Sequence, residues 1–247
     1  MATLPPLVDK ALADTGYDLV EAGDDGWARA RISGEIEDEI WLRVIPEGTL
    51  LALQGVGAAG QIGLLPAGNL PTGAASIGLA NSPEALLRAL RLLKTLAMHP
   101  VGQLSAEVEA RLARIPVTER TREVRERIGQ DVFRDALMEF WDGRCALSGM
   151  ALPRELLRAS HAKPWAQSSD KEKLDPFNGL LLAVRYDALF DKGFIAFDDE
   201  GRLLISPQLD PAVRTFVVLQ DTMRLRFVLP GHAAYLCYHR ENVARLV

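Results

Sequence analysis

The segment spanning residues 145–206 constrains the fold more than any other, because polar residues stand in it at fixed offsets among apolar ones. His161, Asn178, and the pair Asp187 and Asp191 interrupt stretches that are otherwise suited to a protein interior. Buried polar groups are costly unless they find partners, so a chain that encloses such a segment must pair these groups or use them. This pattern is typical of a site, and we expect the rest of the chain to support it.

The bulk composition is that of a globular protein. The chain has 247 residues, of which 48% are hydrophobic and 25% charged, enough for one large domain or two of ordinary size. Its apolar runs are far shorter than the ~20 residues of a membrane span, and the first residues lack the basic start and apolar core of a signal peptide. Cys145 and Cys237 belong to no CxxC pair, which predicts a reduced, cytoplasmic protein without a zinc ribbon or disulfide framework.

Charge is distributed unevenly along the chain. The net charge is −5, and residues 1–100 hold 7 Lys and Arg against 12 Asp and Glu, whereas residues 101–247 hold 21 of each. Binding of a polyanion requires clustered cations, so the acidic N-terminal part is a poor candidate for a nonspecific nucleic-acid clamp. The balanced C-terminal part can still form such a cluster locally.

The first hundred residues predict a small antiparallel sheet with helices. A helix is expected at residues 5–13, and a second begins at Ser82 and Pro83, a capping residue followed by a first-turn proline. Residues 55–72 are rich in Gly, Ala and Pro, and we expect an irregular loop or flap there. Strand-like stretches separated by turn residues lie at 17–21, 27–32, 39–44 and 49–53.

The remainder predicts helices around the central segment. Residues 105–127 contain six Arg and five Glu, which favours a solvated helix interrupted at Pro116. A helix is expected at 127–141, a strand-like stretch at 225–229 and a final helix at 233–247. The predicted class is α+β, with an N-terminal domain at 1–100, a charged connector at 101–126 and a second domain at 127–247.

His161 is a candidate general base. Pro164 follows three residues later and disfavours helix in the residue before it, so we place His161 in a strand or turn with a fixed side chain. An imidazole with a pKa near ~6.5 accepts a proton at neutral pH. A lone histidine is more often structural than catalytic, and this alternative stands.

Asn178 and the two aspartates can each be interpreted as site residues or as purely structural residues. Asn178 stands where a loop turns into a buried segment, so its carboxamide can brace a hairpin or loop; Asn-Gly can also be only a turn. Asp187 and Asp191 lie on the same side of one helical turn, a spacing that suits a hard cation such as Mg²⁺. They can equally form a solvated face or a helix end with Gly193 as its cap.

Taken in order, these motifs resemble the HNH endonuclease superfamily, and more narrowly restriction-type domains with a Ser-His-x-x-Pro-Trp motif. The resemblance spans roughly residues 118–247, and the first hundred residues carry none. It rests on Gly129-Gln130-Asp131-Val132-Phe133-Arg134, Arg144-Cys145-Ala146-Leu147-Ser148-Gly149, Ser160-His161-Ala162-Lys163-Pro164-Trp165, Asn178-Gly179-Leu180-Leu181-Leu182, Asp187-Ala188-Leu189-Phe190-Asp191-Lys192-Gly193 and Tyr238-His239-Arg240-Glu241-Asn242-Val243.

The resemblance implies two antiparallel strands and a helix around one divalent cation. His161 falls at the position of the general base, and Asn178 at that of the residue that holds the loop and orients this base. Asp187 stands where the family has its final His, Asp191 one turn later, and Ser160 where many members have an Asp ligand. Oxygen ligands at these metal positions favour Mg²⁺ or Mn²⁺.

The implied function is metal-dependent hydrolysis of DNA by an endonuclease of restriction or defence type. Lys163, Lys192 and Arg185 are the expected phosphate-binding residues, whereas Cys145 and His239 are expected to serve packing. The N-terminal domain would select the substrate or mediate assembly, and a homodimer is one assembly it could form. Two alternatives stay open: cleavage of RNA by the same chemistry, and a noncatalytic nucleic-acid-binding or assembly protein on a degenerate HNH scaffold. The presence of both a base and its orienting Asn favours catalysis.

Overall fold

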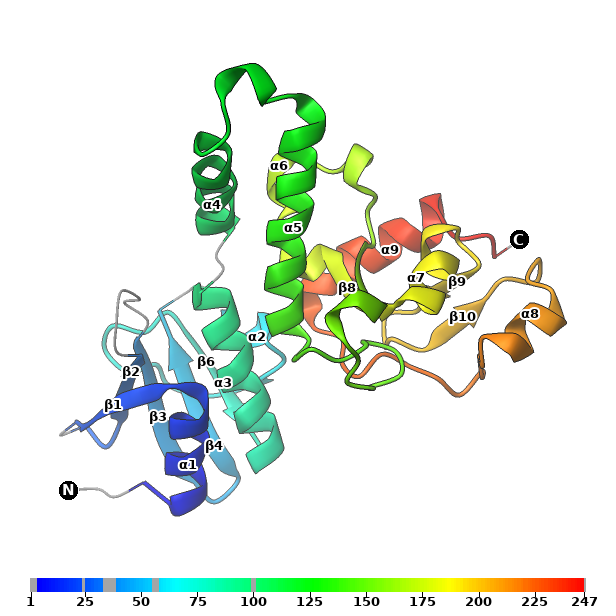
Figure 1. The fold of residues 1–247 in the computed structure, drawn as a ribbon. Coiled ribbons are helices and arrows are strands. Elements are labelled where there is room, and N and C mark those ends of the chain that lie inside the picture. Colours follow the sequence, from blue (N-terminus) through cyan, green and yellow to red (C-terminus); the bar gives the residue numbers. More distant parts are fainter. Residues whose placement is uncertain (1–3, 24, 33–38, 55–57, 99–100, 247) are drawn as a thin grey trace. The chain divides into compact units, whose positions relative to one another are not determined.

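The computed structural model describes residues 4–23, 25–32, 39–54, 58–98 and 101–246. The chain divides into two compact units, Met1–Met98 and His99–Val247 (Figure 1). Within the described residues, no helix combines the length and the apolar character that a membrane span requires.

The first unit is built on an antiparallel sheet. Its strand order is β1-β2-β3-β4-β6-β5, and every neighbouring pair is antiparallel. The four strands predicted from the sequence are confirmed within a residue or so at their ends. The bounds are β1 Tyr17–Ala22, β2 Ala28–Ile32, β3 Glu39–Ile45, β4 Gly48–Leu53, β5 Leu65–Pro66 and β6 Ser76–Ala80.

The expectation of an irregular loop at residues 55–72 is wrong in part. This stretch contains helix α2 (Ala58–Gln61) and strand β5, while residues 55–57 lie outside the described residues. Strand β6 has only small residues at its buried positions, and a Cβ on Gly78 would lie 2.4 Å from Leu64 Cβ. The segment before β5 therefore packs directly on the backbone of β6, and this close approach requires small residues at the buried positions of β6.

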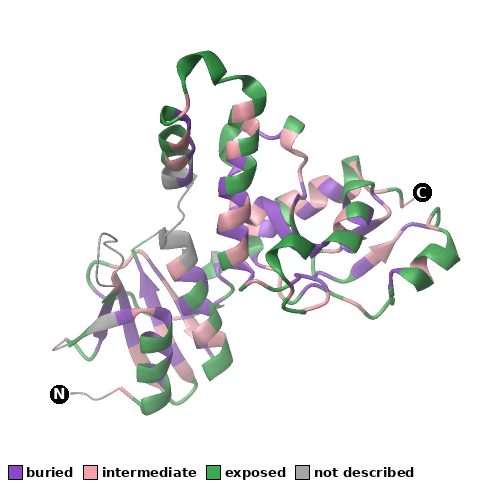
Figure 2. Cartoon of the chain, viewed as in Figure 1, coloured by how far each residue is buried: buried purple, intermediate pink, exposed green. Residues whose placement is uncertain are grey.

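Two helices pack on each other beside this sheet: α1 (Pro6–Thr15), which confirms the predicted first helix, and α3 (Pro83–Met98). The predicted cap of α3 is confirmed, since Ser82 Oγ accepts a hydrogen bond from the Ala85 amide at 3.1 Å. Leucines from helices and strands fill the core, and Figure 2 shows the buried residues concentrated along the strands.

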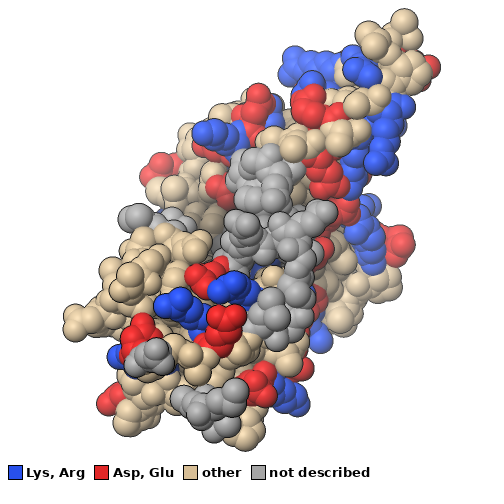
Figure 3. Space-filling model, turned by 90° about the vertical axis from the view of Figure 1, so that its left-hand side faces the viewer, with Lys and Arg blue, Asp and Glu red and all other residues tan. Residues whose placement is uncertain are grey.

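The second unit begins with a helical hairpin. Helices α4 (Val101–Ala113) and α5 (Arg122–Phe140) pack together and are joined through the 3₁₀ turn η1 (Val117–Glu119), so the predicted interruption at Pro116 is confirmed. Part of the charge of this hairpin is neutralised by the ion pairs Arg111–Glu107, Arg111–Asp135, Arg122–Glu126 and Arg125–Glu109. On the face drawn in Figure 3, basic side chains lie among acidic ones.

Helix α5 packs against strand β8 (Gly179–Ala183) of the central segment. Its buried face includes Val132, Phe133, Leu137 and Phe140, and strand β8 begins directly against it. A Cβ on Gly179 would lie 2.5 Å from Leu137 Cδ1 and 2.6 Å from Phe133 Cζ. Only a residue without a side chain allows this approach of strand to helix.

Short elements complete the unit, and two expectations fail here. Residues 225–229 form no strand, because the amides of Leu225 and Arg226 donate to Gly201 and Ala146, which belong to different segments and not to one neighbouring strand. The last helix ends at Asn242, after which Arg245 bonds to Gly193 O, and residue 247 lies outside the described residues. The remaining bounds are η2 Arg154–Leu156, η3 Trp165–Gln167, α6 Asp170–Lys173, η4 Pro176–Asn178, β9 Ile195–Phe197, β10 Leu203–Ile205, α8 Pro211–Phe216, η5 Pro230–His232 and α9 Ala233–Asn242.

The contact of β8 with α5 yields a stability prediction. Gly179→Ala should lower the free energy of unfolding by about 1–3 kcal/mol, because the added methyl group overlaps Leu137 and Phe133. For a chain of this size the melting temperature falls by roughly 3–10 °C, measured by circular dichroism. Gly60→Ala is the matched control, because no atom lies within 4 Å of its added carbon, and its melting temperature should not fall. Equal melting temperatures for Gly179→Ala and wild type would contradict the packing described.

Candidate active site

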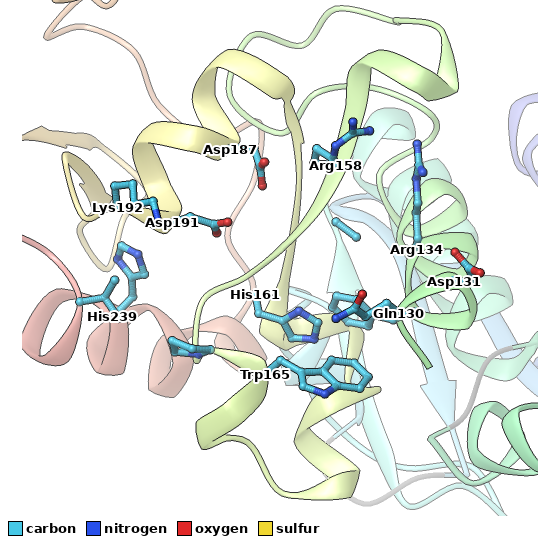
Figure 4. A pocket seen from close by; sticks show the side chains of 14 residues that line it. Gln130, Asp131, Arg134, Arg158, His161, Trp165, Asp187, Asp191, Lys192 and His239 are labelled. Atoms are coloured by element: carbon cyan, nitrogen blue, oxygen red, sulfur yellow. The ribbon is translucent and has the colours of Figure 1, made fainter. Parts of the chain in front are cut away.

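Two strands and a helix follow one another at the centre of the second unit. Strand β7 (Leu157–His161) pairs antiparallel with β8, with His161 opposite Gly179 and Leu157 opposite Ala183. Helix α7 (Val184–Asp191) starts immediately after β8. A pocket of about 540 Å³ lies beside these elements, and His161, Asp187 and Asp191 all line it (Figure 4).

The His161 ring is fixed by aromatic neighbours. It stacks on Phe133 of α5 with a centroid distance of 4.0 Å and an interplanar angle of 20°, and it meets Trp165 edge-on at 5.4 Å. Its Nε2 lies 2.9 Å from the carbonyl oxygen of Lys173. A carbonyl only accepts hydrogen bonds, so Nε2 carries the proton and Nδ1 carries the lone pair.

Burial lowers the pKa of His161 to about 4, and the hydrogen bond to the Lys173 carbonyl opposes this shift only partly. The imidazole is therefore neutral at pH 7, with Nδ1 unprotonated. The expectation that His161 lies in a strand or turn is confirmed, since it is the last residue of β7.

Asn178 braces the loop between β7 and β8 and is fully buried. Its Oδ1 accepts from the Lys163 amide at 2.8 Å, and its Nδ2 donates to Glu172 O at 2.9 Å and to Ser168 Oγ at 3.3 Å. Glu172 immediately precedes Lys173, whose carbonyl holds the His161 ring. Asn178 thus fixes the loop that fixes the histidine, as expected of a bracing carboxamide, and it does not line the pocket.

Ser160 and Asp187 form a hydrogen-bonded pair. Ser160 Oγ donates to Asp187 Oδ1 at 2.6 Å, and Ser160 is buried while Asp187 is half-buried. The serine hydroxyl therefore orients the carboxylate, whose other oxygen, Oδ2, has no hydrogen-bond partner among the described residues.

Asp191 is a carboxylate without a hydrogen bond or ion pair in the described part of the chain. The side chain keeps an exposed surface, yet its partial removal from water raises its pKa to about 6. The negative charge of Asp187 also raises this pKa, and the positive charge of Lys192 lowers it. Two neighbouring carboxylates that disfavour each other's charge are a suitable pair for a cation. The predicted helix end is also confirmed, because α7 ends at Asp191 and Gly193 follows with φ of 72°.

The donor set fits a hard cation only with water completing its coordination. Asp187 and Asp191 supply carboxylate oxygens, which Mg²⁺ accepts in small number while it keeps several waters. Over the described residues, no group of three or more His, Cys, Asp or Glu side chains is placed to hold a metal ion. The third oxygen expected from Ser160 is engaged with Asp187.

The three expected phosphate-binding residues have different surroundings. Lys163 Nζ lies 2.7 and 2.8 Å from the two carboxylate oxygens of Glu172, and these hydrogen bonds are the main reason why the pKa of Glu172 falls to about 2. Arg185 lies over the Tyr186 ring and does not line the pocket. Lys192 does line the pocket and is exposed.

Cys145 and His239 have the packing roles expected for them. Cys145 is buried and free, and its Sγ accepts from the amides of Ser148 and Ala183 at 3.4 Å. His239 is buried, stacks on Phe190 at 3.8 Å, and its Nε2 donates to Phe190 O. His239 also lines the pocket from α9.

Other pocket residues come from parts of the chain that sequence reasoning did not assign to the site. Trp165 belongs to the Ser-His-x-x-Pro-Trp motif, and Gly129 of α5 makes room for its ring, since a Cβ there would lie 2.8 Å from it. Gln130, Asp131 and Arg134 reach the pocket from α5. They belong to the motif at residues 129–134 that is part of the resemblance, which gave them no role in the site; the packing of α5 against β7 and β8 brings them to the pocket.

Comparison with known proteins bears on this site. Residues 145–198 match the family model described as HNH endonuclease. The match includes β7, β8 and α7 with Ser160, His161, Asn178, Asp187 and Asp191 and excludes α5 and α9. No curated protein matches the chain. The segment of residues 145–198, which holds this site, is thus similar to the HNH endonuclease family.

Proposed function

We propose that the protein is a metal-dependent DNA endonuclease of restriction or defence type, which hydrolyses phosphodiester bonds with His161 as general base. One observation carries this proposal: a neutral imidazole with its proton fixed on Nε2 lines the same pocket as two adjacent carboxylates. The restriction or defence role rests on the resemblance to domains with the Ser-His-x-x-Pro-Trp motif, and a cytoplasmic location fits such a role.

His161 would take the proton from the attacking water on Nδ1. Its Nε2–H stays bonded to the Lys173 carbonyl, which stabilises the ring as it gains charge. A pKa of about 4 keeps the base form fully populated at neutral pH but makes the group a weak base. A phosphate anion bound in the pocket raises that pKa, because a nearby negative charge favours the imidazolium form.

Asp187 and Asp191 would hold a divalent cation, with Mg²⁺ or Mn²⁺ favoured by their oxygen ligands. Ser160 keeps Asp187 in place through its hydrogen bond. When bound, the cation supplies charge that neutralises the scissile phosphate and stabilises the leaving 3′-oxygen.

A second candidate function is binding of nucleic acid without cleavage. It is favoured by the small donor set, because only two carboxylates face the pocket from α7 and the Ser160 hydroxyl is engaged with Asp187. It is disfavoured by the position of His161, which lines the same pocket as the carboxylates of Asp187 and Asp191. The role of the first unit, as selector of substrate or as an assembly surface such as a dimer interface, stays a proposal within either function.

Cleavage of supercoiled plasmid in Mg²⁺ or Mn²⁺ tests the base. His161→Gln should lower the nicking rate by about 10²-fold or more, because it removes the proton acceptor. His232→Gln is the matched control: it replaces another buried histidine that does not line the pocket, and it should keep the activity of folded wild type.

Two results would contradict the proposal in different ways. Equal nicking rates for His161→Gln and wild type would show that His161 is not the general base. If wild type cuts neither modified nor unmodified DNA, nor RNA, in either metal, the protein is not a nuclease and the binding function is favoured.

Calorimetric titration with Mn²⁺ at pH 7.5 tests the carboxylates separately from catalysis. Asp187→Asn and Asp191→Asn should each weaken Mn²⁺ binding by roughly tenfold or more, because each removes a negative oxygen ligand. Asp131→Asn is the matched control, since Asp131 lines the same pocket from α5. Equal losses in all three variants would show that only the pocket's overall charge matters and would remove the two aspartates as ligands.

A further inference from the structure

The cations of the pocket differ from most others around them. Arg134, Arg158 and Lys192 line the pocket, and none of them forms an ion pair with an Asp or Glu among the described residues. Nearby cations have such partners: Arg154 pairs with Asp135, and Lys163 with Glu172. Cations without an ion-pair partner thus line this pocket together with the carboxylates of Asp131, Asp187 and Asp191.

Arg134 of α5 and Arg158 of β7 converge on one carbonyl group. Arg134 Nη2 donates to Leu157 O at 3.0 Å, and Arg158 Nη1 donates to the same oxygen at 3.4 Å. The two guanidinium nitrogens therefore lie no further apart than the sum of these two distances. Like charges this close repel each other, and an anion bound beside both would offset the repulsion.

Most donors of this pair are unused by the protein. Each guanidinium group has five N–H donors. Arg134 uses Nη2, for Leu157 O and Arg154 O, and Arg158 uses Nη1, for Leu157 O and Glu155 O. The buried Nε of Arg134 has no hydrogen-bond partner among the residues that the structure describes. Asp131 lies three residues before Arg134 on α5 but forms no ion pair with it.

The cationic surface extends beyond the pocket along α5. Arg127, Gln130 and Arg134 are spaced i, i+3 and i+7, which places them on one face of the helix. Arg127 is exposed and has no ion pair in the described part of the chain. Seven residues of helix span about 10 Å. A single small anion cannot reach along this row, whereas a polynucleotide strand can.

We propose that Arg134 and Arg158 form a phosphate-binding pair for a nucleic-acid strand, at a phosphodiester next to the one cleaved, with Arg127 and Gln130 continuing the strand's path along α5. Arg158 and His161 are three residues apart in β7, about 10 Å between Cα atoms, so the pair and the base serve different phosphates. Figure 4 shows Arg134 and Arg158 beside each other on one side of the pocket, with Asp191 and Lys192 on the other. The identity of the ligand rests on the proposed nuclease function, and α5 lies outside the matched family segment.

Salt-dependent DNA binding tests this pair. Fluorescence anisotropy with a labelled duplex, full-length protein and no divalent cation gives Kd at several salt concentrations. Arg158→Gln should weaken binding roughly tenfold and reduce the slope of log K against log salt by about one, because one phosphate contact is lost. Arg134→Gln should do the same, with circular dichroism as a check that it folds. Duplexes with and without 5′-phosphates should bind equally if an internal phosphodiester is held.

Arg122→Gln is the matched control, because it removes the same charge from the same helix α5 but from an exposed arginine that is paired with Glu126. It should leave the slope unchanged. Equal losses in Arg122→Gln and Arg158→Gln would overturn the pair in favour of a general charge effect. If wild type binds and cleaves DNA but Arg158→Gln binds like wild type, the pair is overturned while the nuclease function stands. If wild type binds no DNA and cuts none, both fail.

Discussion

The hydrogen bond from His161 Nε2 to the Lys173 carbonyl is the interaction on which the site depends. It fixes the tautomer, because a carbonyl cannot donate, and it fixes the ring together with the stack on Phe133. The carbonyl itself is held in place by a buried carboxamide, since Asn178 bonds to Glu172 O one residue earlier and to Lys163 N at the other end of the loop. A single Asn thus sets the direction of the imidazole without touching the pocket.

The charged side chains of the pocket form two groups, one acidic and one basic. Asp187 is oriented by Ser160, whereas Asp191 has no hydrogen bond or ion pair among the described residues and a pKa raised to about 6. Arg134 and Arg158 are two neighbouring cations that form no ion pair with a carboxylate in the described part of the chain. Groups of one sign left uncompensated within a pocket are unfavourable in the free protein, and they become favourable when a phosphate and a cation occupy the same space.

The sequence was sufficient for the parts of the site that lie within one continuous segment. The spacing of Asp187 and Asp191 predicted one helical face, and Pro164 placed His161 outside a helix; α7 and β7 confirm both. It could not show that Ser160 bonds to Asp187, because that contact depends on how β7 packs against α7. Likewise β6 escaped prediction because close packing over Gly78 requires small residues at its buried positions, so the usual large apolar side chains do not mark its core-facing side. The role of α5 depends entirely on tertiary packing.

The tautomer and charge of His161 can be measured directly by long-range ¹H–¹⁵N NMR of protein labelled with ¹⁵N-histidine, with the His161 signals assigned by their loss in His161→Gln. We expect a protonated Nε2 and an unprotonated Nδ1 at pH 7. Because burial lowers the pKa to about 4, the ring should stay neutral as the pH falls through 6.5 and gain its proton only near pH 4. A proton on Nδ1 at pH 7, or titration near the ordinary pKa of ~6.5, would contradict a histidine held as a ready base.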